Sequence, residues 1–418
     1  MNKILLVIIV QIIFNISSFC QENLSNKITI GTRDTIFSNI LSENRPILVY
    51  LPPSYYSNKN QKYPVLYILD GDYNFQYVTG LIELQSSISE NIPEMIVIGI
   101  SGKGSSTYRE NCKPNVKEIE DRGNAESTAL FIKQELIPYI DSTYKTDNYK
   151  ILSGHSIGGL FVINTLLNHP NLFNHYIAIS PALWWGKNAI NDIAKKTLEN
   201  NSNYETSVYI SLANEEGMGV ESFLEVVKSN SIFRFKKIAN ENHNSVGEPT
   251  YKWALNDIFN DWKVEKLYFD SADELSQHYR KTKEHFGRTF NLQNGVIANT
   301  VLYILKDNSA ELKKMQQEIK RFYPNSLSYF NNLLATNFIN DKKFEEAEKL
   351  LNETKNSFPN SYDTFQNLAK VKIEMNELEA ADSLIAKSIL WAKKQNVRQW
   401  QLNELIETKE MIAKKKSN

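Results

Sequence analysis

Short apolar runs alternate with helical patterns over the first part of the chain. Residues 63–69 are a continuous apolar run, which is typical of a strand buried on both faces of a sheet, and 94–100 are predicted as a second buried strand. Helical stretches alternate with these strands, for example 126–144, where apolar residues recur at helical spacing. Further strands are predicted at 27–31, 46–51, 149–153, 175–180, 208–213 and 233–238. Strands that alternate with helices predict an α/β fold with a mainly parallel sheet and helices on both faces.

The pattern changes at about residue 271. From there to the end no strand pattern remains, and the segments are helical and rich in Lys, Glu, Asn, Leu and Ala. Leu334-Ala335 and Ala347 return 34 residues later as Leu368-Ala369 and Ala381. This period, with small residues where two helices cross, predicts an all-α domain of tetratricopeptide-like (TPR-like) repeats. Such repeats form a concave surface that usually binds a protein or peptide partner. The alternative is a helical extension that only covers the sheet domain.

The first residues have the pattern of a secretory signal peptide. Lys3 precedes the apolar run 4–14, and Ser18 and Cys20 place small residues at the two positions that matter for cleavage after Cys20. The run is shorter than the roughly 20 apolar residues that span a bilayer. We therefore expect a signal peptide at 1–20, and a protein exported to the periplasm or secreted. Acylation of Cys20 as a lipoprotein is less favoured, because Phe19 suits that processing poorly. The other two predicted domains are 27–266 and 271–418.

Composition narrows the function classes. The chain has 418 residues, of which 42% are hydrophobic and 23% charged, as in a globular protein. A net charge of −1 gives no long-range field that would attract nucleic acid. After removal of the signal peptide, Cys112 would be the only cysteine, so no internal disulfide is expected. No cluster of His and Cys has metal-ligand spacing, and neither a metal nor a cofactor is predicted.

A candidate nucleophile lies where a strand meets a helix. Gly154-His155-Ser156-Ile157-Gly158 follows the strand 149–153 and precedes an apolar helical run. This is the G-x-S-x-G turn that exposes a serine hydroxyl at the edge of an α/β-hydrolase sheet. The helix dipole and the free N–H groups at the helix start favour developing negative charge. The pattern predicts that Ser156 is nucleophilic.

The partners of the serine follow from chain order, which in α/β-hydrolases is Ser, acid, His. Of the six histidines, one lies in the turn, two precede any acid and two fall in the helical region. His243, on a polar loop, is the remaining candidate base. The acid is expected just after the strand 208–213, at Glu215 or Glu216, with Glu216 preferred.

The oxyanion of an acyl-transfer intermediate needs two backbone N–H donors. One is expected at Ile157, directly after the nucleophile. The second is expected from the loop after the strand 63–69, from Gly71 or Asp72. Asp70 and Asp72 could instead suggest a metal pair, but no histidine cluster supports one.

Four segments together resemble the family of α/β-hydrolases called putative esterases. They are Tyr63–Gly71, Gly154–Leu160, Ser180–Trp185 and the His243 loop, and the resemblance covers roughly residues 27–266. The family includes siderophore, feruloyl and acetyl-xylan esterases, S-formylglutathione hydrolase and mycolyl transferases. The siderophore-esterase branch is the most similar. The resemblance implies a carboxylic ester hydrolase acting on a small-molecule or glycan-linked ester.

The resemblance also bears on single residues. Family members carry their acid three residues after the small residue that ends the strand, which is Ala213 here, and this favours Glu216. The family's Arg-x-x-Asp-x-x-Pro segment corresponds to Arg109–Pro114 without the aspartate, so Arg109 is a weakened candidate for substrate binding. Trp184 and Trp185 have two interpretations, core packing or an aromatic wall of the substrate pocket, and both stay open.

The predicted function is thus an exported serine esterase with a Ser156, His243 and Glu216 triad. Two other functions stay open: an acyltransferase using the same residues, and a non-catalytic binding protein that uses the repeats. Siderophore, plant-phenolic, acetylated-sugar and peptide-linked esters all fit the sequence.

Overall fold

The computed structural model describes residues 28–57, 60–102, 104–116, 119, 123–200, 206–305 and 309–417. The expected signal peptide, with Cys20, lies outside the described residues. Within them, no helix is both long enough and apolar enough to cross a membrane.

Eight strands form one sheet in the order β1-β2-β4-β3-β5-β6-β7-β8. The β1–β2 and β2–β4 pairs are antiparallel, and all other neighbours are parallel. The strands are β1 Thr32–Ser38, β2 Glu43–Tyr50, β3 Tyr63–Leu69, β4 Ile96–Ile100, β5 Thr146–His155, β6 His175–Ile179, β7 Ser207–Leu212 and β8 Phe233–Lys237. The predicted mainly parallel sheet is confirmed. The strand expected at 27–31 is wrong, since described residues 28–31 form no strand and β1 begins at Thr32. This edge strand is mostly exposed, so its sequence has no hydrophobic pattern from which to place it.

Helices cover both faces of the sheet. They are α2 Gly71–Glu83, α3 Ser105–Cys112, α4 Ala125–Phe131, α5 Ile137–Thr143, α6 Ile157–Asn168, α7 Trp185–Asn200, α8 Val220–Val227 and α9 Gly247–Ile258. The apolar run of β3 supplies both layers: Val65 and Tyr67 pack into the core with α6, whereas Leu66 and Ile68 pack into the core with α2 and α9. Alternate side chains of a strand face opposite sides, so this run must be apolar throughout.

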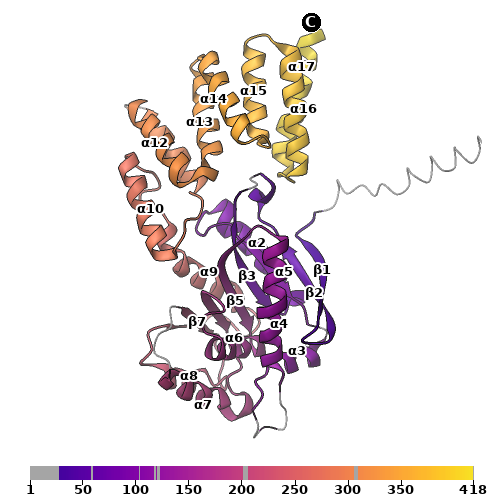
Figure 1. Ribbon diagram of the computed structural model, residues 1–418, viewed down its shortest axis with the longest axis vertical. Coiled ribbons are helices and arrows are strands. Elements are labelled where there is room, and N and C mark those ends of the chain that lie inside the picture. Colours follow the sequence, from indigo (N-terminus) through magenta and orange to yellow (C-terminus); the bar gives the residue numbers. More distant parts are fainter. Residues whose placement is uncertain are drawn as a thin grey trace, which may run out of the picture.

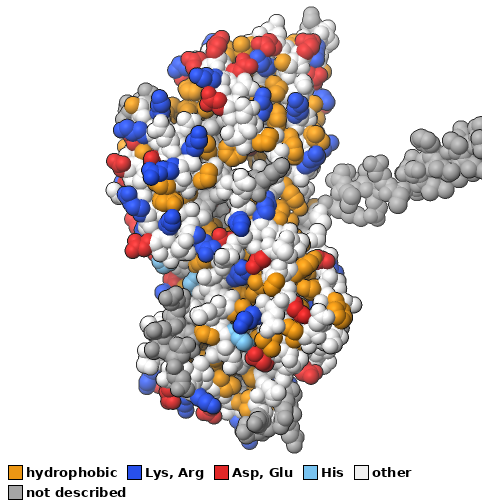
Figure 2. Space-filling model, viewed as in Figure 1, with side chains coloured by type: hydrophobic (Ala, Val, Ile, Leu, Met, Phe, Trp, Pro, Cys, Tyr) orange, Lys and Arg blue, Asp and Glu red, His pale blue; other side chains and the backbone are white. Residues whose placement is uncertain are grey.

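A helical region follows the sheet domain and lies at one end of the molecule (Figure 1). Its helices are α10 Ala272–Phe286, α11 Asn294–Leu305, α12 Ser309–Phe322, α13 Leu327–Asn340, α14 Phe344–Ser357, α15 Tyr362–Glu374, α16 Leu378–Lys394 and α17 Gln399–Ser417. The described residues of this region contain no strand, so the change of pattern at about residue 271 is confirmed. Acidic and basic side chains are interspersed over the face that Figure 2 presents.

The residues that recur after 34 positions occupy equivalent places in this region. Ala335 and Ala369 lie in α13 and α15, Ala347 and Ala381 lie in α14 and α16, and all four are fully buried. Buried amides add a polar link between α13 and α15. Asn367 Nδ2 donates to Asn332 Oδ1 at 3.0 Å, and Asn332 Nδ2 donates to Thr364 Oγ1 at 2.9 Å. These bonds fix the register of neighbouring helix pairs.

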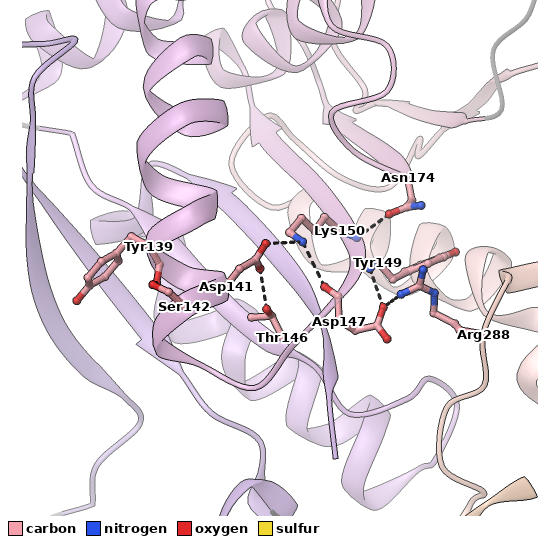
Figure 3. A network of polar contacts seen from close by, with 9 residues as sticks. All are labelled: Tyr139, Asp141, Ser142, Thr146, Asp147, Tyr149, Lys150, Asn174 and Arg288. Carbon is pink, nitrogen blue, oxygen red and sulfur yellow. Dashed lines mark hydrogen bonds and ion pairs between the residues drawn. The ribbon is translucent and has the colours of Figure 1, made fainter. Parts of the chain in front are cut away.

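The helical region joins the sheet domain at the amino-terminal ends of the parallel strands. Phe286 and Phe290 pack on Tyr149, with ring centroids 5.9 and 5.7 Å away, and belong to the core of the sheet domain. Arg288 pairs with Asp147 at the start of β5 (Figure 3). The boundary expected between residues 266 and 271 therefore cuts through one hydrophobic cluster, because residues beyond 271 complete the core.

Two carboxylates of the sheet domain strengthen this junction. Glu90 accepts hydrogen bonds from the N–H groups of Asn294 and Gly295 at the start of α11, both at 2.8 Å. A negative charge at a helix start is favourable. Glu83 faces Arg398 at 3.5 Å across a cleft of about 980 Å³ that separates α2 from the ends of the repeats.

Candidate active site

Ser156 occupies a strained turn between β5 and α6. Its backbone has φ 56° and ψ −116°, a conformation that a residue with a Cβ adopts at a cost of about 1–3 kcal/mol. Two hydrogen bonds hold it there: Ser156 N–H donates to the carbonyl of Ile179, and Ala182 N–H donates to the carbonyl of Ser156, both at 2.9 Å. Strained residues held in this way cluster at functional sites. The serine is thus on the strand–turn–helix that its sequence pattern predicts.

The flanking glycines are required by close contacts. A Cβ on Gly154 would lie 2.4 Å from the carbonyl oxygen of Gly158. A Cβ on Gly158 would lie 2.4 Å from the hydroxyl of Tyr108. Tyr108, on α3, therefore supports the turn, and no motif in the sequence pointed to it.

The Ser156 hydroxyl is available for chemistry. The residue is half-buried, and no hydrogen bond to its hydroxyl occurs among the described residues. Ile157 begins α6, so its N–H has no partner within the helix. A negatively charged oxygen bound to Ser156 would therefore meet a free donor and the positive end of the helix dipole.

His243 is paired with Glu215. The distance from His243 Nδ1 to Glu215 Oε2 is 2.8 Å, and the two side chains are 33% and 17% exposed. An ionised carboxylate only accepts hydrogen bonds, so this contact puts the proton on Nδ1 and leaves Nε2 free to accept one. That tautomer is the one a general base for Ser156 requires.

The preference for Glu216 is therefore corrected, because Glu216 is exposed. The chain turns sharply after β7, with Glu215 N–H donating to the carbonyl of Ala213 and Asn214 N–H to that of Glu241, both at 2.9 Å. Because of this tight turn, the carboxylate that points toward His243 is that of Glu215, two residues beyond Ala213, and not that of Glu216. The sequence offered both glutamates, and the glycine that follows them, Gly217, does not distinguish which one faces His243.

The second loop expected to hold the oxyanion lies at the end of β3. Asp70 has a left-handed backbone conformation (φ 53°) and precedes α2, so the N–H groups of Gly71 and Asp72 fall in the first turn of that helix. A Cβ on Gly71 would lie 2.7 Å from the backbone of Gly99 in β4. Gly71 thus allows α2 to approach the sheet. Burial, with the charge of Asp72, raises the pKa of the Asp70 carboxyl.

The three candidate residues for substrate binding differ in their exposure to solvent. Trp185 is 4% exposed and belongs to the core that contains α6, so packing explains it. Trp184 is 49% exposed. Its backbone N–H donates at 2.9 Å to the carbonyl of Met218, which lies on the loop that follows Glu215. It remains the candidate for a pocket wall. Arg109 is exposed on α3, beside Tyr108.

His155 is the second residue of the site that sequence reasoning passed over. Its ring lies 4.6 Å from the ring of His243, at an angle of 41°. Burial lowers the pKa of His155 to about 4, and the charge of His243 lowers it further. His155 is therefore neutral near pH 7. Its place in the G-x-S-x-G turn, directly before the serine, was the available signal. Among the described residues no group of three or more His, Cys, Asp or Glu side chains could hold a metal.

A sheet of this topology, with a serine on a strained strand–helix turn, defines the class of α/β-hydrolases. Residues 38–261, more than half of the chain, match the family described as "Putative esterase". The chain belongs to this family.

Individual proteins and solved structures are also similar to this chain. The ferri-bacillibactin esterase BesA of Bacillus subtilis is 29% identical over 181 residues, which are 39% of this chain and 63% of BesA. The match thus spans less than two thirds of that relative. The crystal structure of an IroE-like serine hydrolase from Shewanella oneidensis has a TM-score of 0.61 at 21% identity and covers 70% of this chain and 99% of that one.

One similar structure includes the helical region. An uncharacterised protein from Capnocytophaga ochracea has a TM-score of 0.53 at 15% identity, covering 90% of this chain and 99% of that one. The likeness concerns the fold alone, and a sheet domain followed by helices is therefore not confined to this chain.

Proposed function

We propose that this chain is an exported serine esterase that hydrolyses siderophore-type esters through Ser156, His243 and Glu215. The observation that carries the proposal is the 2.8 Å contact between His243 Nδ1 and Glu215, because it leaves a basic nitrogen next to the turn that bears Ser156. The signal-peptide pattern at 1–20 supports export.

In the proposed mechanism, Ser156 Oγ attacks the ester carbonyl while His243 Nε2 takes its proton. Glu215 stabilises the imidazolium that forms. The tetrahedral oxyanion receives hydrogen bonds from the N–H of Ile157 and from that of Gly71 or Asp72, at the starts of α6 and α2. When the intermediate collapses, His243 returns the proton to the departing alkoxide. Water then attacks the acyl-enzyme with His243 again as base, and no cofactor takes part.

The substrate class rests on the relative that acts on ferri-bacillibactin and on two side chains near the site. Trp184 offers an exposed aromatic face, and Arg109 offers an exposed cation. An aromatic face and a cation suit an ester whose acyl groups are aromatic and anionic. Phenolic and acetylated-sugar esters are the comparison substrates.

The test compares the wild-type protein with Ser156→Ala on a p-nitrophenyl ester, a ferric catecholate triester and a feruloylated sugar. We expect covalent labelling of Ser156 by a fluorophosphonate probe, and loss of all hydrolysis in Ser156→Ala. Hydrolysis by Ser156→Ala within tenfold of wild type refutes the mechanism. Faster turnover of the feruloylated sugar refutes the substrate class alone. An added alcohol that captures most of the acyl group would identify an acyltransferase instead.

For the helical region we propose a TPR-like array that docks a protein or peptide partner. Two observations support it: the 34-residue offset of buried alanines, and the attachment of the region at the amino-terminal ends of the strands. Ser156 lies beyond the carboxyl end of β5, so the helices do not cover the site (Figure 1). Removing a charge from the repeats should therefore leave small-ester turnover unchanged.

A further inference from the structure

Two polar atoms beside His243 lack partners. His155 Nε2 and Glu215 Oε1 are both buried, and neither makes a hydrogen bond among the described residues. An unpaired buried polar group costs about 1–3 kcal/mol, so native structures rarely leave one without a protein or water partner. Here two polar atoms are left without partners on the two side chains that contact the His243 imidazole.

The surroundings of His155 decide its chemical state. The residue ends β5, directly before Ser156, and its ring packs on His243 at 4.6 Å. Because burial lowers its pKa to about 4, the ring is neutral and only one nitrogen carries a proton. A hydrogen bond to the backbone of His243 uses that proton, and the unpartnered Nε2 is left as an acceptor. The charge of Glu215 acts on the same ring and favours its protonated form. Glu215 is therefore within electrostatic reach of His155.

We propose that His155 is a positioning residue whose Nε2 is linked to Glu215 Oε1 by one bound water, which donates a hydrogen bond to each of the two atoms. This inference rests on the proposed triad. With Oε1 held by this water and Oε2 by His243, the carboxylate is fixed at both oxygens. His243 then keeps its Nδ1–H contact and its orientation toward Ser156. Fixing a catalytic group in this way contributes through geometry, since small misplacements cost turnover.

The proposal separates two roles of the ring, packing and hydrogen bonding. His155→Phe keeps a neutral flat ring against His243 and removes the nitrogen that binds the water. His155→Gln keeps a polar group that can bind the water and removes the ring. His175 provides a matched control, since it is another buried histidine whose burial lowers its pKa to about 4, but it bonds to Tyr149.

The experiment is a double-mutant cycle of His155→Phe and Glu215→Gln, with kcat and KM measured on a p-nitrophenyl ester. If His155 acts through Glu215, His155→Phe lowers kcat at least about tenfold with KM within about threefold. In the Glu215→Gln background the same change should then have less than about a threefold effect. His155→Gln should recover part of the lost kcat, and His175→Phe should change thermal stability only.

A second readout is the proton that His243 shares with Glu215, which gives a far-downfield NMR signal. It should weaken or shift in folded His155→Phe and stay unchanged in His175→Phe. The proposal is overturned if kcat of His155→Phe stays within threefold of wild type, or if its loss is equally large in both backgrounds. Those results leave the esterase mechanism intact, whereas an active Ser156→Ala would remove the mechanism itself.

Discussion

Glu215 Oε2 lies 2.8 Å from His243 Nδ1, whereas its neighbour Glu216 is exposed. Only the first carboxylate can orient the imidazole and stabilise its cation. We expect Glu215→Gln to lower kcat at least about tenfold, since misorienting the base has cost about 10⁴ in a serine protease. Glu216→Gln is the matched control and should stay within about threefold of wild type. The reverse order of the two variants in steady-state assays would return the acid to Glu216.

The strain at Ser156 leads to a prediction on stability. Glycine adopts φ 56° without the cost that a Cβ imposes, whereas alanine keeps that cost. Both Ser156→Ala and Ser156→Gly should be inactive. Ser156→Gly should nevertheless be more stable than Ser156→Ala by about 1 kcal/mol, because relief of about 1–3 kcal/mol of strain outweighs the greater freedom of glycine in the unfolded chain. Thermal unfolding of the two variants side by side measures this difference, and equal midpoints would mean that the turn is not strained.

Much of the fold could be predicted because burial leaves a pattern in the sequence. The continuous apolar runs of β3 and β4 need partners on both faces, and that requirement alone predicts the layered sheet. The turn that bears Ser156 was predictable for a similar reason, because glycines are needed where a Cβ would meet the backbone or a side chain. β1 was misplaced, since an exposed edge strand carries no such pattern.

The details that the sequence left open depend on contacts between distant segments. Which glutamate faces His243 is decided by hydrogen bonds from Asn214 and Glu215 in the turn after β7. Likewise, Trp184 and Trp185 are indistinguishable as neighbours in sequence, and only the packing of α7 buries the second. That Phe286 and Phe290 complete the core of the sheet domain could not be predicted, because they look like ordinary apolar residues until Tyr149 is placed beside them.

Tyr108 and Gly158 should be energetically coupled. Gly158→Ala would put a methyl group 2.4 Å from the Tyr108 hydroxyl, so we expect a destabilisation of about 1–3 kcal/mol and slower ester hydrolysis. Tyr108→Phe removes the oxygen and makes room. In the double variant, part of the lost stability and activity should return. Chemical denaturation and kcat measured over the cycle test this, and additive effects would show that the clash is relieved in some other way.

The junction between the two regions should be essential for the sheet domain. A chain cut after residue 270 lacks Phe286 and Phe290, which would expose Tyr149 and Phe259 at the amino-terminal edge of the sheet. We expect this shortened protein to be insoluble or inactive. In the full chain, Phe290→Ala should cost about 3–5 kcal/mol. Leu390→Ala, at a site that is 50% exposed, serves as the control and should cost little. A soluble, fully active protein ending at 270 would contradict the prediction.

The raised pKa of Asp363 leads to a prediction about how the folding stability depends on pH. It lies in the first turn of α15 and lines the cleft between the sheet domain and the repeats, and burial raises its pKa from 3.8 to about 6. The folded protein therefore binds this proton more tightly than the unfolded chain does. Ionising Asp363 lowers the folding stability as pH rises from about 4 to 6, and the cost is complete above that range.

Replacing Asp363 with asparagine removes this cost. A shift of about two pKa units corresponds to on the order of 2–3 kcal/mol of folding free energy. The variant also loses the attraction between the carboxylate and the helix dipole, which reduces the gain by about 0.3–1 kcal/mol. We therefore expect Asp363→Asn to raise the thermal midpoint at pH 7.5 and to change it little at pH 4. Asp273→Asn is the control, because Asp273 is also in the first turn of a helix but is exposed. It should lower the midpoint slightly at pH 7.5. A drop in the midpoint of Asp363→Asn at pH 7.5 would mean that the carboxylate is stabilised in the cleft, against the direction of its pKa shift.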